Sequence, residues 1–231
     1  MPFEAQWQEI RAKMARHPDG DEAMRQIRLI RQREILRTAI ADASGLLDQD
    51  AVGNALSDAD RAAVLGALHV AENMMFGHPE ARQDKAGELC DLLLVAMGRQ
   101  GGREIGYGSD LDVMFVHRPR PGADHDAAQR QAVELAKQVT SLLHKPCRPP
   151  VLAERPLIVD ADLRPEGKKG PLARSLESYQ EYYRRWADTW EVQALLRARA
   201  IAGDPGLAED FTAWADSVRY AGDPGRRAPR S

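Results

Sequence analysis

The sequence predicts an α+β fold in which a small mixed sheet with flanking helices is preceded by a helical segment. Apolar residues recur at helical spacing before Leu92, short apolar runs and glycine-rich turns follow it, and helical spacing returns after Gly170. A chain of 231 residues is long enough for one full-sized domain and an accessory segment. We expect a helical segment at 1–88, a mixed domain at 89–220 and a disordered tail at 221–231, where Pro, Gly and Arg replace the helical pattern.

The helical segment is rich in charge. From Met24 to Ile40, apolar side chains share one helical face, and arginines are spread around the rest: Arg25, Arg28, Arg31, Arg33 and Arg37. The main interpretation is a solvated surface, and a face that binds phosphate or a partner is the alternative. A further helix is expected from Ser57 to Met75, with Ser57 and Asp60 in its N-terminal cap.

Three short strands are expected to form the sheet. The first, Leu92 to Met97, is apolar throughout and ends at Gly98, where the glycine-rich turn "GRQGGREIGYG" begins. The second strand is Asp110 to His117, and the third is Pro156 to Leu163. Between these two strands, Ala127 to His144 has apolar residues at the spacing of an amphipathic helix.

Beyond Gly170, aromatic residues recur at helical spacing. The stripe that they form consists of Tyr179, Tyr183, Trp186, Trp190 and Ala194. Aromatic side chains at such spacing more often pack in a core than bind a ligand. We therefore expect this stripe to be buried.

Composition limits the classes of function. The formal net charge of −3 gives no overall basic surplus of the kind that binds nucleic acid, so no nucleic-acid partner is expected. Cys90 and Cys147 are far apart and have no CxxC partner, so neither a disulfide framework nor a zinc site is indicated. The longest apolar run, Leu92 to Met97, is too short to cross a bilayer, and no export signal is visible. No membrane association is expected, and the protein is expected in the cytoplasm.

The stretch "GREIGYGSDLDVMFVH" places two aspartates where an apolar strand begins. Because side chains alternate along a strand, Asp110 and Asp112 point to the same side, while Leu111 and Val113 point into the core. Two half-buried carboxylates repel each other unless a cation neutralises them. Hard oxygen ligands suit Mg²⁺, which proteins usually hold with a few carboxylates, substrate phosphates and water.

Three neighbours strengthen this interpretation. The glycines from Gly98 to Gly108 let backbone N–H groups approach phosphates, and Ser109 adds a hydroxyl next to the aspartates. Asp160 lies within the apolar strand "LIVDADLRP", where a charge needs a partner. A cation shared with the first two aspartates would supply that partner.

A glycine turn, DxD on the next strand and a third carboxylate on a later strand together resemble the DNA polymerase β-like nucleotidyltransferase superfamily, and the fold of that superfamily is the one expected here. A narrower resemblance rests on "LRPEGKKGPL", the Tyr- and Trp-rich stretch after it, and "LLRAR". From about Leu92 to Tyr220 the chain resembles one nucleotidyltransferase domain of bacterial glutamine synthetase adenylyltransferase, also called glutamate–ammonia-ligase adenylyltransferase. The wording of the motifs is closer to the C-terminal, adenylylating domain.

The resemblance implies roles for nine residues. The residues that match the metal-binding carboxylates are Asp110, Asp112 and Asp160. Those that match the nucleotide-binding segments are Gly98, Arg99, Gly101, Ser109, Arg164 and Arg197, of which the last two could equally form structural ion pairs. Asp162 departs from the family pattern, where a basic residue is expected.

The resemblance also implies a function. Mg²⁺ would serve as cofactor and ATP as substrate, and AMP would be transferred to a tyrosine of glutamine synthetase, which regulates nitrogen assimilation. A PII-type regulatory protein would be a partner through the full-length enzyme. Family members combine an adenylylating and a deadenylylating domain, whereas this chain has room for one.

Three alternatives stay open. The same carboxylates could run the reverse, phosphorolytic removal of AMP. The chain could be a non-catalytic fragment that binds a nucleotide or a partner. A small-molecule nucleotidyltransferase shares the metal-binding pattern, although it would not require the segment from "LRPEGKKGPL" to "LLRAR".

Overall fold

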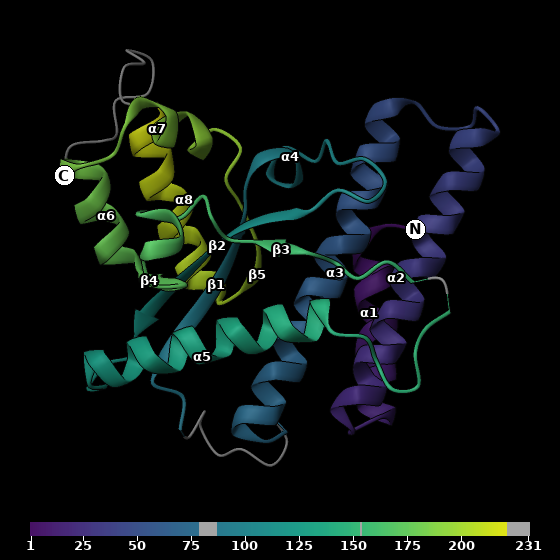
Figure 1. Cartoon of the computed structure of the whole chain (residues 1–231), viewed down its shortest axis with the longest axis horizontal. Helices are drawn as coiled ribbons and strands as arrows, with labels where there is room; N and C mark the ends of the chain where they lie inside the picture. Colours follow the sequence, from purple (N-terminus) through teal and green to yellow (C-terminus); the bar gives the residue numbers. More distant parts are fainter. Residues whose placement is uncertain (79–86, 153, 221–231) are drawn as a thin grey trace.

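A central sheet separates two groups of helices in the computed structural model, which describes residues 1–78, 87–152 and 154–220 (Figure 1). Helices α1 to α3 stand on one side of the sheet, α6 to α8 stand on the other, and the long α5 crosses below it (Figure 1). The predicted combination of a small mixed sheet and flanking helices is confirmed. The predicted tail at 221–231 lies outside the described residues.

The helical segment contains α1 (Phe3–Arg16), α2 (Gly20–Ala43) and α3 (Gln49–Phe76). The side chain of Asp48 caps α3 by accepting a hydrogen bond from the backbone N–H of Ala51. The expected start of this helix near Ser57 was therefore wrong. Ser57 and Asp60 lie inside α3 and are buried there. Asp60 forms an ion pair with Arg31 and does not cap a helix terminus.

In the described part of the chain the sheet has five strands: β1 (Cys90–Ala96), β2 (Leu111–Pro119), β3 (Val159–Asp160), β4 (Ala173–Ser175) and β5 (Arg199–Gly203). The order β3-β2-β1-β5 forms the main path, and β4 also pairs with β2. β1 runs antiparallel to β2 and β5, whereas β3 and β4 run parallel to β2. The third strand is much shorter than the eight residues expected from Pro156 to Leu163, because residues 156–158 lie outside the ladder and turns begin at Asp162.

Both faces of the sheet are covered, so β1 and β2 each contain a continuous buried apolar run, at residues 92–96 and 113–116. The remaining helices are α4 (Gly98–Gly101), α5 (His125–His144), α6 (Leu176–Arg185), α7 (Thr189–Leu195) and α8 (Pro205–Arg219), with a short 3₁₀ turn at Gly167–Lys169. Leu94 and Val113 face α3 and α5, while Val95 and Met114 face α6 to α8. The alternation predicted around the two aspartates is confirmed, since Leu111 and Val113 are fully buried.

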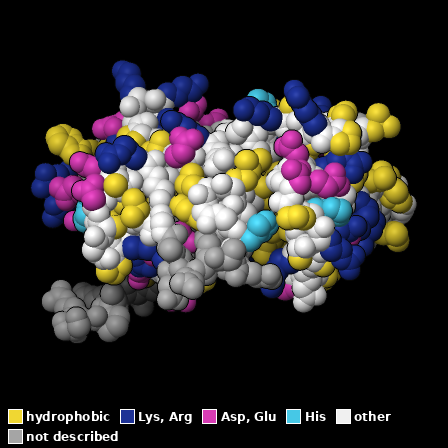
Figure 2. Space-filling model, turned by 90° about the horizontal axis from the view of Figure 1, so that it is seen from below, with side chains coloured by type: hydrophobic (Ala, Val, Ile, Leu, Met, Phe, Trp, Pro, Cys, Tyr) yellow, Lys and Arg dark blue, Asp and Glu magenta, His cyan; other side chains and the backbone are white. Residues whose placement is uncertain are grey.

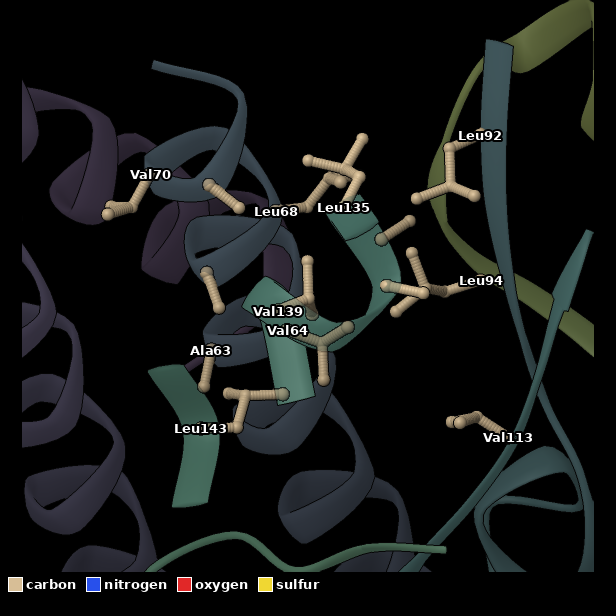
Figure 3. Packing of buried hydrophobic residues seen from close by; sticks show 14 of the residues in the cluster. Ala63, Val64, Leu68, Val70, Leu92, Leu94, Val113, Leu135, Val139 and Leu143 are labelled. Carbon is tan, nitrogen blue, oxygen red and sulfur yellow. The ribbon is translucent and has the colours of Figure 1, made fainter. Parts of the chain in front are cut away.

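Side chains from the helical segment and from the sheet share one buried cluster. Figure 3 shows Val64 and Leu68 of α3 and Val139 of α5 directed toward Leu94 of β1, and all four are buried. Complete burial of one such aliphatic side chain contributes about 1.5–3 kcal/mol. The helical segment is thus packed on the sheet by a continuous apolar core.

The expected aromatic stripe is only half right. Tyr179 is fully buried on α6. The helix ends at Arg185, however, and α7 begins only at Thr189, so Trp186 and Trp190 are 71% and 53% exposed. Asp188 and Glu191 form a capping box that starts the second helix, and this interrupts the continuous helical spacing assumed for the stripe.

The surface combines both signs of charge. On the face viewed in Figure 2, basic and acidic side chains are interspersed with small apolar groups. Within the described ranges, no helix has the length and apolar character needed to cross a membrane.

Candidate functional site

Parallel pairing of β2 and β3 brings two aspartates side by side. The register places Asp112 opposite Asp160 and Leu111 opposite Val159, and the backbone N–H of Leu111 donates to the carbonyl of Ile158 at 2.8 Å. Asp110 lies just before β2 and is exposed to solvent. Asp160, distant in sequence, is therefore brought to the start of β2, where Asp110 and Asp112 lie.

The electrostatics of Asp112 reflect this arrangement. Burial raises the pKa of its carboxyl group, the negative charges of Asp160 and Asp110 raise it further, and the nearby Arg99 lowers it. A half-buried carboxylate next to two others is stabilised by any cation that reaches it. Arg99 is exposed and forms no ion pair with a described residue. Its guanidinium is therefore free to offset part of the negative charge at Asp112.

The chemistry of the donors fits a hard divalent cation, because all three are carboxylates. Burial and the neighbouring negative charges destabilise the ionised form of Asp112, and a bound cation would stabilise it. Among the described residues, however, no group of three or more His, Cys, Asp or Glu side chains is arranged as a formed metal site. The backbone N–H of Asp162 donates to Asp160 Oδ1 at 2.7 Å, so Asp160 has one oxygen engaged and the other left for a ligand.

The glycine-rich turn lies directly against these carboxylates. Gly98 adopts a φ of +51°, and a Cβ atom at this position would lie 2.5 Å from Oδ2 of Asp112. A Cβ atom at Gly101 would lie 1.8 Å from the carbonyl oxygen of Arg197. Both positions require glycine, and the first leaves space next to Asp112.

Helix α3 and strand β5 hold the glycine-rich turn in place. The buried Gln100 donates from Nε2 to the carbonyl of Ser57, and Arg103 pairs with Asp58 on α3. Arg199 of β5 donates to the carbonyls of Gln100 and Gly101. Burial, together with repulsion from nearby arginines, lowers the pKa of Arg199 to about 10, so the guanidinium remains charged at neutral pH.

The other predicted nucleotide-binding residues have partners inside the protein. Ser109 lies next to the carboxylates, and its Oγ accepts the backbone N–H of Gly106 at 3.1 Å. Arg164 donates to the carbonyls of Ala161 and Gly170. Arg197 pairs with Glu104 at 2.8 Å. Arg164 and Arg197 thus make the structural contacts that were considered as the alternative to nucleotide binding.

Strand alternation predicted that Asp162 would face the site together with Asp160, but β3 ends at Asp160, so the alternation does not extend to Asp162. Its carboxylate lies 3.2 Å from Lys168 Nζ and 3.6 Å from Arg164 Nη1. This ion-pair cluster lies in the turn that follows β3. Asp160 is thus the carboxylate of "VDAD" that faces Asp112.

Arginines of α2, expected to be mainly solvated, hold the segment that leads to β3. Arg28 is 3% exposed and donates from Nη1 to both carboxylate oxygens of Glu154 at 3.0 Å. From Nη2 it donates to the carbonyls of Leu142 and Leu143, at the end of α5, and of Lys145 just beyond it. A single buried side chain therefore ties α2, α5 and the segment before Asp160 together.

Arg31 and Gln32 continue this attachment one turn further along α2. Arg31 donates from Nε to Asp60 at 2.6 Å and from Nη1 to the carbonyl of Arg155 at 2.9 Å. Gln32 donates from Nε2 to the carbonyl of Leu152 at 2.8 Å. The sequence signal was the spacing of 28, 31 and 32 on one helical face, but apart from Asp60 the partners lie more than a hundred residues away.

A cavity of about 460 Å³ opens next to Asp110. Helix α2, the turn before β2 and the segment before β3 form its walls. Its size and mixed apolar and polar lining are typical of a site for a small molecule.

Comparison with known proteins gives one consistent family. A family model described as glutamate-ammonia ligase adenylyltransferase matches residues 1–214. The chain is 44% identical over 214 residues to the bifunctional glutamine synthetase adenylyltransferase/adenylyl-removing enzyme of Mycobacterium avium (strain 104). It is 42% identical over 212 residues to the protein of the same name from Mycobacterium tuberculosis (strain ATCC 25618 / H37Rv), and 41% identical over 228 residues to that from Streptomyces coelicolor.

These matches cover 92% of this chain but 20–21% of the relatives. The chain thus spans about a fifth of the length of the curated relatives that it matches. Residues 1–214 include both the helical segment and the carboxylate cluster, so the match covers the site and the helices that hold it.

Proposed function

The chain belongs to the glutamate-ammonia ligase adenylyltransferase family, and from this membership we propose that it transfers AMP from ATP to a tyrosine of glutamine synthetase. The observation that supports this proposal most strongly is the pairing of Asp112 with Asp160 next to the glycine-rich turn. Phosphoryl and nucleotidyl transfer depend on positioning and on neutralisation of phosphate charge, and this arrangement is suited to both.

Asp110, Asp112 and Asp160 would hold Mg²⁺, which lowers the pKa of an attacking hydroxyl and stabilises a departing pyrophosphate when it is bound. In this mechanism the glycine at position 98 keeps the space next to Asp112 free for a phosphate. The guanidinium of Arg99 adds positive charge near Asp112. The carboxylate nearest the tyrosine hydroxyl accepts its proton.

The direction of the reaction is the finer part of the proposal. The segments Gly106 to Asp110 and Arg164 to Leu172 resemble the adenylylating domain more than the removing one. The names of the relatives contain both activities, so removal of AMP by phosphate is the second candidate. The carboxylates themselves suit either direction, because the reacting phosphorus is the same.

One experiment with two arms tests the proposal. In the first arm, the protein is incubated with Mg²⁺, unmodified glutamine synthetase and ATP labelled on its α-phosphate. We expect label on glutamine synthetase and release of pyrophosphate. In the second arm, adenylylated glutamine synthetase and inorganic phosphate replace these substrates, and we expect no ADP.

Asp160→Asn is the control that should silence either reaction. ADP release without AMP transfer would reverse the direction. Silence of the unaltered protein in both arms would favour a fragment that binds nucleotide or partner without turnover.

A further inference from the structure

The cavity next to Asp110 has features that the metal and phosphate chemistry does not use. Asp110 lies on its wall, so the cavity communicates with the carboxylate cluster. Tyr107 and Ile158 also line it and are 46% and 49% exposed. Two partly exposed apolar side chains beside a polar site are suited to a ligand that is flat and apolar at one end and charged at the other.

The ring of Tyr107 is fixed and accessible. Its hydroxyl group donates to Asp42 Oδ2 at 3.1 Å, which anchors the end of the side chain on α2. In the described part of the chain, no other aromatic ring lies against it. An aromatic face of this kind stacks readily on a nucleobase.

Gln32 offers a directional polar group in the same cavity. Because its Nε2 donates to the carbonyl of Leu152, its Oε1 is left as an acceptor. The neighbouring Glu154 has both carboxylate oxygens occupied by Arg28. The exocyclic amine of adenine is a donor that matches the oxygen of Gln32, whereas the carbonyl of hypoxanthine at the same position does not.

Arg155 supplies a cation between the cavity and the carboxylates. A Cβ atom at Gly108 would lie 2.0 Å from Nη1 of Arg155, so this guanidinium packs directly over the glycine. Gly108 also has a φ of +72°, which favours glycine. No acidic side chain among the described residues pairs with Arg155. A phosphate oxygen could therefore accept a charge-assisted hydrogen bond from its guanidinium.

We propose that this cavity binds the adenosine half of ATP, with the base against Tyr107 and Ile158, its amine on Gln32, and the α-phosphate between Arg155 and Asp110. This inference rests on the proposed function and assigns the nucleoside subsite of the same reaction. It also gives the helical segment a direct role, because Gln32 and the partner of Tyr107 lie on α2.

Calorimetric titration of the full chain with Mg-ATP, Mg-ITP and Mg-tripolyphosphate tests the proposal. We expect ATP to bind about tenfold more tightly than ITP, which lacks the matched hydrogen bond, and about 100-fold more tightly than tripolyphosphate, which also lacks the stacking base, since each interaction contributes on the order of a factor of ten. Tyr107→Ala should remove about tenfold of the affinity for ATP and leave the affinity for tripolyphosphate unchanged. Tyr107→Phe, which keeps the ring, should retain the binding of ATP.

The comparison of ligands on the unaltered protein does not depend on the folding of a variant. Equal affinity for ATP and tripolyphosphate, or an equal loss of both in Tyr107→Ala, would overturn the nucleoside subsite while leaving nucleotidyl transfer intact. Equal affinity for ATP and ITP would remove Gln32 from the subsite. Failure of both ATP and tripolyphosphate to bind with Mg²⁺ would overturn the proposed function together with this inference.

Discussion

At the scale of the residue, Asp112 is a half-buried carboxyl group that lies close to two further negative charges. Its pKa is raised by burial and by the charges of Asp160 and Asp110. Asp112→Asn removes both the repulsion and a metal ligand. We expect AMP transfer to fall at least about 100-fold, because even loss of groups that only orient a ligand reduces activity 10- to 100-fold, and the melting temperature to stay equal or rise. Unchanged transfer would remove Asp112 from the metal site.

A glycine comparison separates backbone strain from the contact with Asp112. Gly98 and Gly45 both have positive φ, but a Cβ atom meets Asp112 at Gly98 and nothing within 4 Å at Gly45. Substitution by Ala should lower the free energy of unfolding by about 1–2 kcal/mol at either position. Only Gly98→Ala should also reduce transfer. Equal transfer by the two variants, measured at saturating ATP, would mean that the space at Gly98 is not used.

The sequence predicted individual residues best where local geometry was sufficient. Alternation along β2 correctly placed Asp110 and Asp112 opposite the buried Leu111 and Val113. The sequence predicted that Asp112 and Asp160 share a cation, but it did not predict that they lie opposite each other. The register of β3 depends on contacts between residues far apart in the chain. Arg155 was not found at all, since an exposed arginine in a loop has no sequence signature.

At the scale of the element, His117 connects β2 with α5 and β4. Gln129 of α5 donates from Nε2 to the carbonyl of Ala173, so its Oε1 faces His117 and the ring donates from Nε2 at 2.8 Å. His117 is 1% exposed, and its Nδ1 has no hydrogen-bond partner among the described residues. Protonation would bury an unpaired charge, and burial accordingly lowers the pKa of His117 below its usual 6.5.

This histidine predicts a pH dependence of stability. Because the pKa of His117 is lower in the folded chain, the unfolded chain takes up the proton first as the pH falls. The contribution of His117 to stability is therefore complete above about pH 6.5 and is lost progressively below it. Denaturant unfolding at about pH 7.5 and about pH 5.5 should show a larger loss for the unaltered protein than for His117→Gln. Equal losses would contradict this assignment.

Arg28 is the second test at this scale. Its ion pair with Glu154 has side chains only 4% and 8% exposed, and removal of one partner leaves a buried charge. Arg28→Met should cost about 3–5 kcal/mol of unfolding free energy, and the added Glu154→Leu substitution should restore part of it. A strictly additive double variant, measured by denaturant unfolding, would mean that the pair is not coupled.

The errors in predicting elements have a common physical cause. Helical spacing and cap residues indicated a helix start at Ser57, but Asp48 supplies the cap and Asp60 is used by Arg31 inside the fold. The continuous aromatic stripe ignored the capping box at Asp188. In each case the sequence correctly indicated a helix. The residues at which the helices begin and end, and the partners of the polar side chains, were decided by contacts that the local pattern did not show.

At the scale of the whole molecule, the helical segment and the sheet depend on each other. Ile27 and Leu68 of the helices lie in the same buried cluster as Leu94 and Val139. Polar contacts also join the two parts, since α3 holds the glycine-rich turn and α2 holds the segment before β3. The division at residue 88 suggested by composition thus crosses a continuous core.

A chain that starts at Gly87 tests this dependence. Without α1 to α3, the apolar faces of α5 and β1 that include Leu135, Val139 and Leu94 would be exposed, and the turn at Gln100 would lose its anchor on Ser57. Each fully exposed aliphatic side chain forfeits about 1.5–3 kcal/mol, and a few of them equal the stability of a typical domain, about 5–15 kcal/mol. We expect no cooperative thermal transition from the shortened chain. Adding the fragment 1–78 in trans should restore the transition, because this fragment carries the missing apolar surface. A cooperative transition of the shortened chain at the temperature of the full chain would mean that the sheet and its remaining helices form an independent core.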